Sequence, residues 1–248
     1  MTGNIPTPEE MSDHLQIIMR GVNSQLFQIL GNRVVYGPFK GMEIKQDPAW
    51  RDGNAGTKLL GCYEFELEPT IAKAVERNPK AIINIGCAEG YYAIGLARLL
   101  PDAIVFAVDL DESSLWECRE LAIKNDVAER MQFYRGCHYA NELDFDVPEN
   151  RLYVIDCEGD EDKLLDKQQC PALIKSDIIV ECHDFLKPGI TEELRKRFSD
   201  THEIEVIKPQ LPPLGRFPAM AEAPAVMELL AVTEKRPMPT RWLACWAH

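Results

Sequence analysis

The segment 81–100 constrains the fold of this chain more than any other. It opens with an apolar run, Ala81 to Ile85, that has the composition of a buried parallel strand. Small residues then form a turn, with Gly86, Ala88 and Gly90 at alternate positions, and an apolar helix pattern follows at once. A strand, a tight glycine turn and a helix in this order bring backbone N–H groups towards a nucleotide-like ligand in Rossmann-type sheets.

A second apolar run, Ala103 to Val108, ends in Asp109. An acid about 20 residues past the glycine turn accepts hydrogen bonds from ribose hydroxyls in such folds. The turn lacks the spacing Gly-x-Gly-x-x-Gly, which favours a ligand without a pyrophosphate. A dinucleotide site and a glycine turn that binds nothing are the alternatives.

Composition narrows the function classes. The chain has 248 residues, of which 46% are hydrophobic, enough for one large α/β domain with additions or at most two small domains. The formal net charge of −13 disfavours nucleic acid and anionic membranes as partners. We expect no signal peptide, because residues 1–20 contain acids and Pro but no apolar core segment, and no stretch has the length of a transmembrane helix. The eight cysteines form no Cys-x-x-Cys pair, so we interpret them as reduced core thiols of a cytoplasmic protein.

The chain divides into an N-terminal addition, residues 1–60, and a core domain, residues 61–248. In the addition, apolar residues at spacings of three and four predict a helix over 8–30, which can cap the sheet or form a homodimer. A hairpin or extended segment is expected over 34–44. A long Pro-rich insertion at about 210–241 is expected to act as a lid.

The core domain alternates strands with helices, which predicts a largely parallel α/β sheet. Seven strands are expected, the last two as an antiparallel hairpin, and a Ser114–Glu117 capping box is expected to open one helix. The expected strands are 81–85, 103–108, 131–134, 152–155, 178–180, 203–207 and 242–246. Ligands of such sheets bind beyond the carboxyl ends of the strands. Those ends are unusually polar here: Asn84, Asp109, Cys137, Asp156, Glu181 and His183.

Two further segments carry a family resemblance. The sequences Ile-Asp-Cys-Glu-Gly-Asp-Glu, at 155–161, and Ile-Val-Glu-Cys-His-Asp, at 179–184, resemble elements of the FkbM-like methyltransferases. The glycine turn, Ile-Gly-Cys-Ala-Glu-Gly-Tyr-Tyr, also resembles motif I of the class I S-adenosylmethionine-dependent methyltransferases. The resemblance covers roughly residues 80–200. Asn84 departs from it, because the family usually has Asp there.

The resemblance implies a Rossmann-like class I methyltransferase sheet, S-adenosylmethionine as cofactor, and a hydroxyl on a small molecule or sugar as acceptor. It assigns the methionine part to Gly86, Ala88 and Gly90, the ribose to Asp109, the adenine edge to Gly136 and Cys137, and the border between cofactor and acceptor to Asp156. Asn84 can hydrogen-bond the ammonium end of the cofactor. Glu89 is either a cofactor contact or an acid in the first turn of the helix.

For a hydroxyl acceptor the site has to remove one proton. His183 is the expected base, because imidazole titrates near neutrality, and Asp156, Glu158 and Glu181 can orient it. Alternatively, Asp156 and Glu181 hold a divalent cation together with His183 or Asp184, since catechol-type O-methyltransferases place metal ligands after the same two strands. A metal-dependent O-methyltransferase, an N-methyltransferase of natural-product biosynthesis and a non-catalytic cofactor-binding protein are the rival functions.

Overall fold

The structure is a computed structural model, and it describes residues 7–48, 54–137, 139–143, 147–234, 236, 238 and 240–248. Its helices are α1 (Pro8–Leu30), α2 (Ala55–Leu60), α3 (Glu68–Glu76), α4 (Tyr91–Leu99), α5 (Glu112–Lys124), α6 (Glu161–Leu164), α7 (Ile190–Phe198) and α8 (Ala225–Val232). Its strands are β1 (Ala81–Ile85), β2 (Ile104–Asp109), β3 (Met131–Arg135), β4 (Arg151–Ile155), β5 (Asp177–Cys182), β6 (His202–Ile207) and β7 (Arg241–Ala247).

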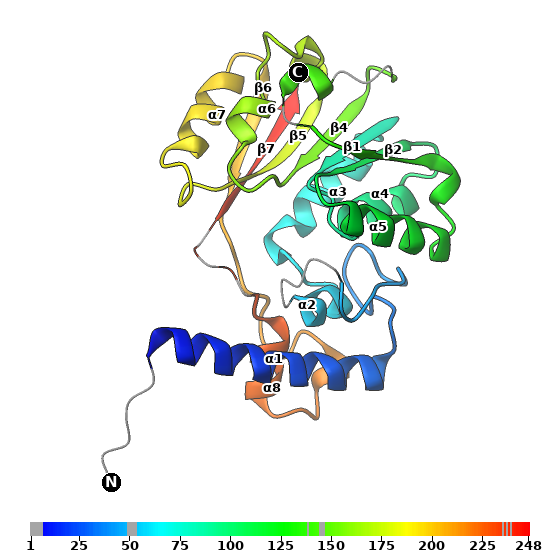
Figure 1. Cartoon of the computed structure of the whole chain (residues 1–248), viewed down its shortest axis with the longest axis vertical. Helices are drawn as coiled ribbons and strands as arrows, with labels where there is room; N and C mark the ends of the chain where they lie inside the picture. The colour runs from blue at the N-terminus through cyan, green and yellow to red at the C-terminus, as the bar shows by residue number, and fades with distance from the viewer. Residues whose placement is uncertain are drawn as a thin grey trace. The chain divides into compact units, whose positions relative to one another are not determined.

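The strands form one seven-stranded sheet in the order β3-β2-β1-β4-β5-β7-β6 (Figure 1). The first five strands of this order run parallel, and β7 runs antiparallel to both of its neighbours, β5 and β6. The strand order reverses between β1 and β4, and ligands of open α/β sheets bind at this switch point. The predicted mostly parallel sheet with a last antiparallel hairpin is therefore confirmed.

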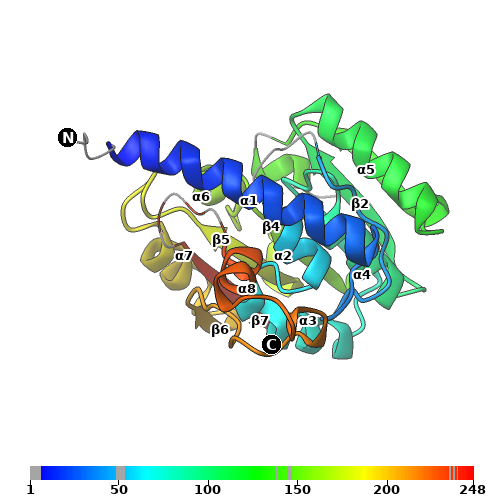
Figure 2. The same cartoon turned by 90° about the horizontal axis from the view of Figure 1, so that it is seen from below.

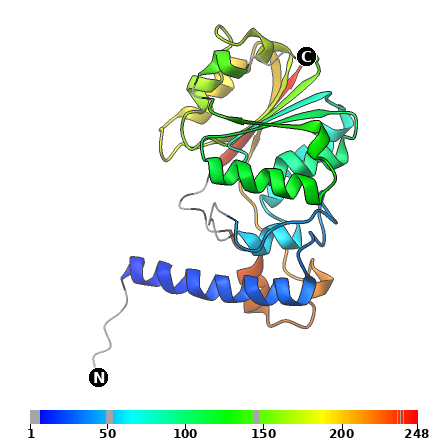
Figure 3. The same cartoon turned by 45° about the vertical axis from the view of Figure 1, so that its right-hand side comes forward.

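Helices cover both faces of the sheet, as Figures 1 and 3 show. Helices α4 and α5 pack on β1, β2 and β3, whereas α6 and α7 contact β5, β6 and β7. The central strands are buried on both faces, so they are apolar throughout: β1 reads Ala-Ile-Ile-Asn-Ile, and all five residues are buried. The polar Asn84 inside this apolar strand is thus an exception that its surroundings have to explain.

The start of α5 corrects one sequence prediction. The expected capping box at Ser114 does not begin the helix; Asp111 does, because its carboxylate accepts hydrogen bonds from the backbone N–H groups of Ser113 and Ser114. An Asp at this position satisfies two N–H groups that have no partner inside the helix. In the expected hairpin over 34–44, the pairing between strands is limited to one antiparallel bridge, Arg33 with Glu43.

The chain separates into two compact units. The larger unit, residues 64–210 and 236–248 of the described chain, holds the whole sheet. In the smaller unit, residues 7–47, 54–63 and 211–234, α1 packs on α2 and α8 (Figure 2). This helix buries Met19, Val22, Leu26 and Phe27 and exposes Leu15, Ile17, Ile18 and Ile29. The boundary at residue 60, the lid and the homodimer stay predictions.

No helix among the described residues is long and apolar enough to cross a membrane.

Candidate functional site

The glycine turn, residues 86–90, follows β1 at the switch point of the sheet. Its backbone N–H groups are used within the protein: those of Gly86 and Cys87 bond to the carbonyl oxygen of Val108, and that of Ala88 bonds to Asp109 Oδ2 at 2.8 Å. A phosphate-binding turn instead points such groups at its ligand. In this respect the turn differs from a phosphate-binding turn, and the kind of ligand it takes stays a prediction.

Packing explains two of the glycines. A Cβ at Gly86 would overlap the carbonyl oxygen of Asp156, and a Cβ at Gly90 would press on Cys118 and Ile94. Both residues also have positive φ, +71° and +96°, which glycine adopts without strain. Gly86 thus lets the ends of β1 and β4 lie against each other, so the sheet itself holds the turn in place.

Asp109 is the last residue of β2, as predicted. Its Oδ2 accepts from Ala88, and its Oδ1 accepts from the backbone N–H of Asp111 at 2.9 Å. An ionised carboxylate offers about four lone-pair sites, so two remain for hydroxyl donors of a ligand. The two backbone bonds fix the direction in which these sites point.

Two residues beside the turn are buried polar groups. Asn84 is 2% exposed, and its Nδ2 donates to the carbonyl oxygen of Val154 at 3.1 Å. Its Oδ1 is buried and has no hydrogen-bond partner in the described part of the chain. Glu89 is 5% exposed, so it is more enclosed than an ordinary acid in the first turn of a helix. A buried acceptor without a partner, such as Asn84 Oδ1, calls for a donor.

On the far side of Asp109, Gly136 and Cys137 follow β3. Both have positive φ, and the N–H of Cys137 donates to Glu142 at 3.1 Å. Burial and the charge of Glu142 raise the pKa of Cys137 to about 12. Its side chain is therefore a neutral thiol, which suits contact with an uncharged ring.

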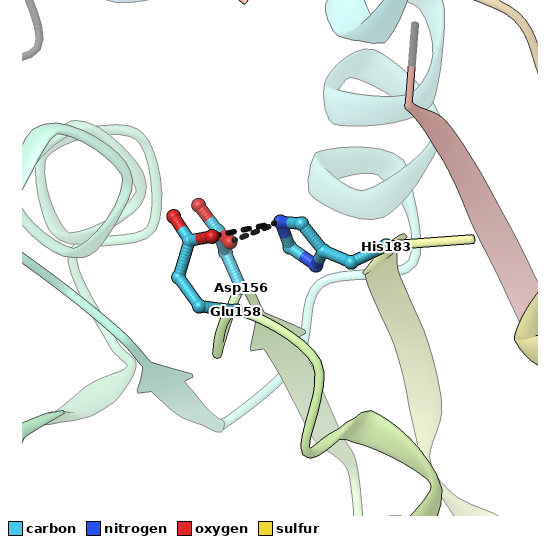
Figure 4. A group of neighbouring side chains, drawn as sticks. All are labelled: Asp156, Glu158 and His183. Carbon is cyan, nitrogen blue, oxygen red and sulfur yellow. Dashed lines mark ion pairs between the residues drawn. The ribbon is translucent and has the colours of Figure 1, made fainter. Parts of the chain in front are cut away.

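At the ends of β4 and β5 lies a carboxylate cluster, which we define as Asp156, Glu158, Glu161, Glu181 and His183. Asp156 follows β4, Glu181 is in β5, and His183 follows β5. The Nε2 atom of His183 lies 3.5 Å from Glu158 Oε2, 3.6 Å from Asp156 Oδ1 and 3.6 Å from Glu181 Oε2. Figure 4 shows His183 pointing at Asp156 and Glu158. The structure thus brings together the residues that the sequence predicts.

Glu161 is a residue whose role the sequence analysis missed. It is fully buried in α6, and its Oε1 contacts His183 Nδ1 at 2.6 Å and accepts from the N–H of Gly159 at 2.9 Å. Burial alone would lower the pKa of His183, but the bond to Glu161 and the charge of Glu181 outweigh it, so this pKa is raised. The signal available in the sequence was an acid, Glu161, that begins a short segment ending in the apolar Leu164 and Leu165.

For Asp156, burial and the neighbouring charges act in the same direction. Burial raises the pKa of Asp156 well above its usual value, and the neighbouring carboxylates, that of Glu181 first, raise it further. Its Oδ1 is buried without a hydrogen-bond partner among the described residues. Asp156 is therefore the acid of the cluster whose ionised form is disfavoured unless a positive group lies beside it.

Two residues near β7 complete this edge of the sheet, and the sequence analysis did not assign them. Thr240 donates a hydrogen bond to Glu181 Oε1, and Arg236 lies 3.8 Å from the same atom. Arg236 also pairs with the buried Glu66 at 2.9 Å. One oxygen of Glu181 is thus held from β7, and the other faces His183.

Comparisons with known proteins agree with this architecture. No family model matches the chain. A release factor glutamine methyltransferase of Synechocystis sp. is 41% identical over 54 residues, which are 22% of this chain and 18% of that protein. The matched segment therefore spans less than a fifth of the relative's length.

Solved structures show the fold. The human methyltransferase 10 domain containing protein superposes with a TM-score of 0.51 at 12% identity, over 94% of this chain and 96% of its own. An rRNA methylase from Streptococcus thermophilus gives a TM-score of 0.50 at 12% identity, over 73% of this chain and 96% of its own. The fold is accordingly the Rossmann-like fold of class I methyltransferases.

Proposed function

We propose that this chain is an S-adenosylmethionine-dependent methyltransferase, FkbM-like, that methylates a hydroxyl of a small molecule or sugar. One observation carries the proposal: the glycine turn uses its own N–H groups internally and places Asp109 beside it with two lone-pair sites left. The local similarity to a glutamine methyltransferase supports the reaction class.

The residues at the switch point fit this cofactor. S-adenosylmethionine carries an ammonium group, and the buried Oδ1 atom of Asn84 is an acceptor without a partner among the described residues. Asp156 would border both cofactor and acceptor. Asp109 would hold the ribose, and Gly136 and Cys137 would border the adenine. When bound, the cofactor supplies an electrophilic methyl group that a nucleophilic oxygen displaces in line.

On the acceptor side, we keep Asp156, Glu181 and His183 as the proposed catalytic group. A hydroxyl acceptor has to lose a proton. Because Glu161 holds Nδ1 of His183, Nε2 is the ring nitrogen that remains for this task.

The predicted lid, residues 210–241, would enclose the acceptor. Deleting residues 212–218 in a chain that still folds should raise the KM for the acceptor, and an unchanged KM and kcat would contradict the lid.

The proposal is tested in two steps. First, isothermal titration calorimetry should detect one site for S-adenosylhomocysteine, the demethylated cofactor. Second, incubation with S-adenosylmethionine labelled in its methyl group should transfer label to one compound in a set of hydroxylated small molecules and sugars. Absence of cofactor binding would overturn the proposal. Binding without transfer to any hydroxyl or amine would instead support a non-catalytic binding protein.

A further inference from the structure

The Nε2 atom of His183 lies among hydrogen-bond acceptors. Glu161 is an acceptor when ionised, so the hydrogen of a neutral ring belongs on Nδ1, and Nε2 presents a lone pair. That lone pair faces Glu158 Oε2 at 3.5 Å and Asp156 Oδ1 at 3.6 Å. Acceptors that face each other require a positive group between them, which is either a proton on Nε2 or a bound cation.

We infer that His183 Nε2, Asp156 Oδ1 and Glu158 Oε2 form a binding site for a divalent metal ion (Figure 4). Glu158 takes the place that the sequence analysis gave to Glu181. Thr240 and Arg236 engage one oxygen of Glu181, and the ligand atoms of Asp156, Glu158 and His183 all lie within 4.8 Å of one another.

The spacing of the three atoms supports this site. One ligand atom from each residue lies within 4.8 Å of the other two. An ion bound about 2.1 Å from each of its ligands with tetrahedral angles keeps those ligands about 3.4 Å apart. The distances from Nε2 to the two carboxylates, 3.5 and 3.6 Å, are close to this value. Small side-chain movements therefore suffice.

Two independent observations point to a ligand. Asp156 Oδ1 is buried and lacks a hydrogen-bond partner in the described part of the chain, although the Asp156 side chain as a whole is 31% exposed. Glu161 is fully buried and holds the other ring nitrogen, and metal-binding histidines usually donate that N–H to a carboxylate. Glu161 thus acts as a positioning residue for Nε2.

The ligand set indicates the kind of ion. One imidazole with two carboxylates suits Mn²⁺ or Zn²⁺ better than Mg²⁺, which prefers oxygen alone. Three protein ligands leave a coordination position open for water or a hydroxyl. If the proposed function holds, an acceptor hydroxyl at that position would have a lowered pKa. Metal binding itself does not depend on the proposed function.

The test uses Mn²⁺, because the eight thiols of the chain can bind Zn²⁺ elsewhere. The full chain is treated with a chelator, desalted and titrated with Mn²⁺, while the electron paramagnetic resonance signal of free Mn²⁺ is recorded. We expect one site in the wild type and at least about a 10-fold loss of affinity in Glu158→Gln. Glu158 is 56% exposed, so this variant should fold.

Asp160→Asn is the matched control. It removes one negative charge from the same loop, but Asp160 pairs with Lys163 at the surface and should leave the Mn²⁺ affinity unchanged. Glu161→Gln should weaken binding about 10- to 100-fold while circular dichroism shows an unchanged fold. That result separates positioning of His183 from a merely structural role.

Absence of a stoichiometric Mn²⁺ site in the wild type, or equal affinity in Glu158→Gln and Asp160→Asn, would overturn the inference. S-adenosylhomocysteine is titrated into the same samples. Cofactor binding without Mn²⁺ binding leaves the proposed function standing and removes the metal site. Mn²⁺ binding without cofactor binding does the reverse.

Discussion

Acids lie on both sides of the switch point, beside the glycine turn and in the carboxylate cluster, but their negative charge is balanced in different ways. Around the glycine turn, the single carboxylate of Asp109 is balanced by the two backbone N–H groups that it accepts from. In the carboxylate cluster, acids from β4, β5 and α6 converge on one imidazole, and Asp156 Oδ1 has no hydrogen-bond partner among the described residues. The acid beside the glycine turn is thus satisfied by backbone groups, whereas the carboxylate cluster is where we propose a bound cation.

The largest expected effect concerns His183 in the carboxylate cluster. His183→Ala should lower kcat for methyl transfer by about 10²- to 10⁴-fold, because both proposed roles of Nε2 are lost, while S-adenosylhomocysteine still binds. A chelator separates the two roles: it should abolish wild-type activity if Nε2 holds a metal and leave it intact if Nε2 is the base. A near-normal rate in His183→Ala would show that the cluster has neither role.

The next effect tests the contact between the two sides. Gly86→Ala should lower the free energy of unfolding by about 2–5 kcal/mol, since it combines strain at positive φ with overlap on the Asp156 carbonyl. Gly189→Ala is the control, because Gly189 has φ +90° but an added Cβ meets nothing within 4 Å. Denaturant unfolding measures both variants. Equal losses would mean that the close approach contributes nothing.

A smaller effect is expected at Asp109, beside the glycine turn. Asp109→Ala should weaken S-adenosylhomocysteine binding by about 1.5–3 kcal/mol, as for hydrogen bonds to a charged group. Asp111→Ala removes the cap of α5 and should lower stability by about 1 kcal/mol without changing that affinity. Calorimetry on both variants provides the comparison. If Asp109→Ala binds as tightly as the wild type, the ribose assignment is wrong.

The smallest expected effect concerns a second buried histidine, His202, whose pKa shifts in the opposite direction to that of His183. Burial lowers the pKa of His202, whose Nε2 donates to the carbonyl oxygen of Ser176 at 2.9 Å. The unfolded chain then binds more protons, so stability is full above the unfolded value of about 6.5 and falls as pH drops below it. The melting temperature of His202→Asn should therefore decline less steeply than that of the wild type between pH 7.5 and 5. Parallel curves would contradict this.

The sequence predicts the glycine turn and Asp109 better than the contacts of the carboxylate cluster, because the residues around the turn lie close together in the chain. Strand β1 has the predicted bounds, and Asp109 ends β2 as expected, because the strand, the turn and the acid lie within 29 residues of one another. A pattern of local apolar runs and small residues determines such a unit. Even there, the start of α5 depends on which of two neighbouring polar residues caps it.

The partners of the carboxylate cluster come from tertiary structure instead. Glu161 approaches His183 because α6 packs against β5, and no local spacing in the sequence encodes that contact. Thr240 and Arg236 approach Glu181 because β7 inserts between β5 and β6. The sequence indicates that these strand ends are polar, but not which oxygen meets which nitrogen.

The place of β7, last in the chain but next to β5 in the sheet, has a consequence for the order in which the site assembles. In a ribosome-bound chain, β1 to β5 are synthesised well before residues 236–247, and domains generally fold from the N-terminal side during synthesis. Glu181 would then wait for Thr240 and Arg236, with its charge exposed to water on an unpaired strand edge. The nascent sheet would thus stay open at β5, and closure by β7 would join the last step of folding to the completion of the site.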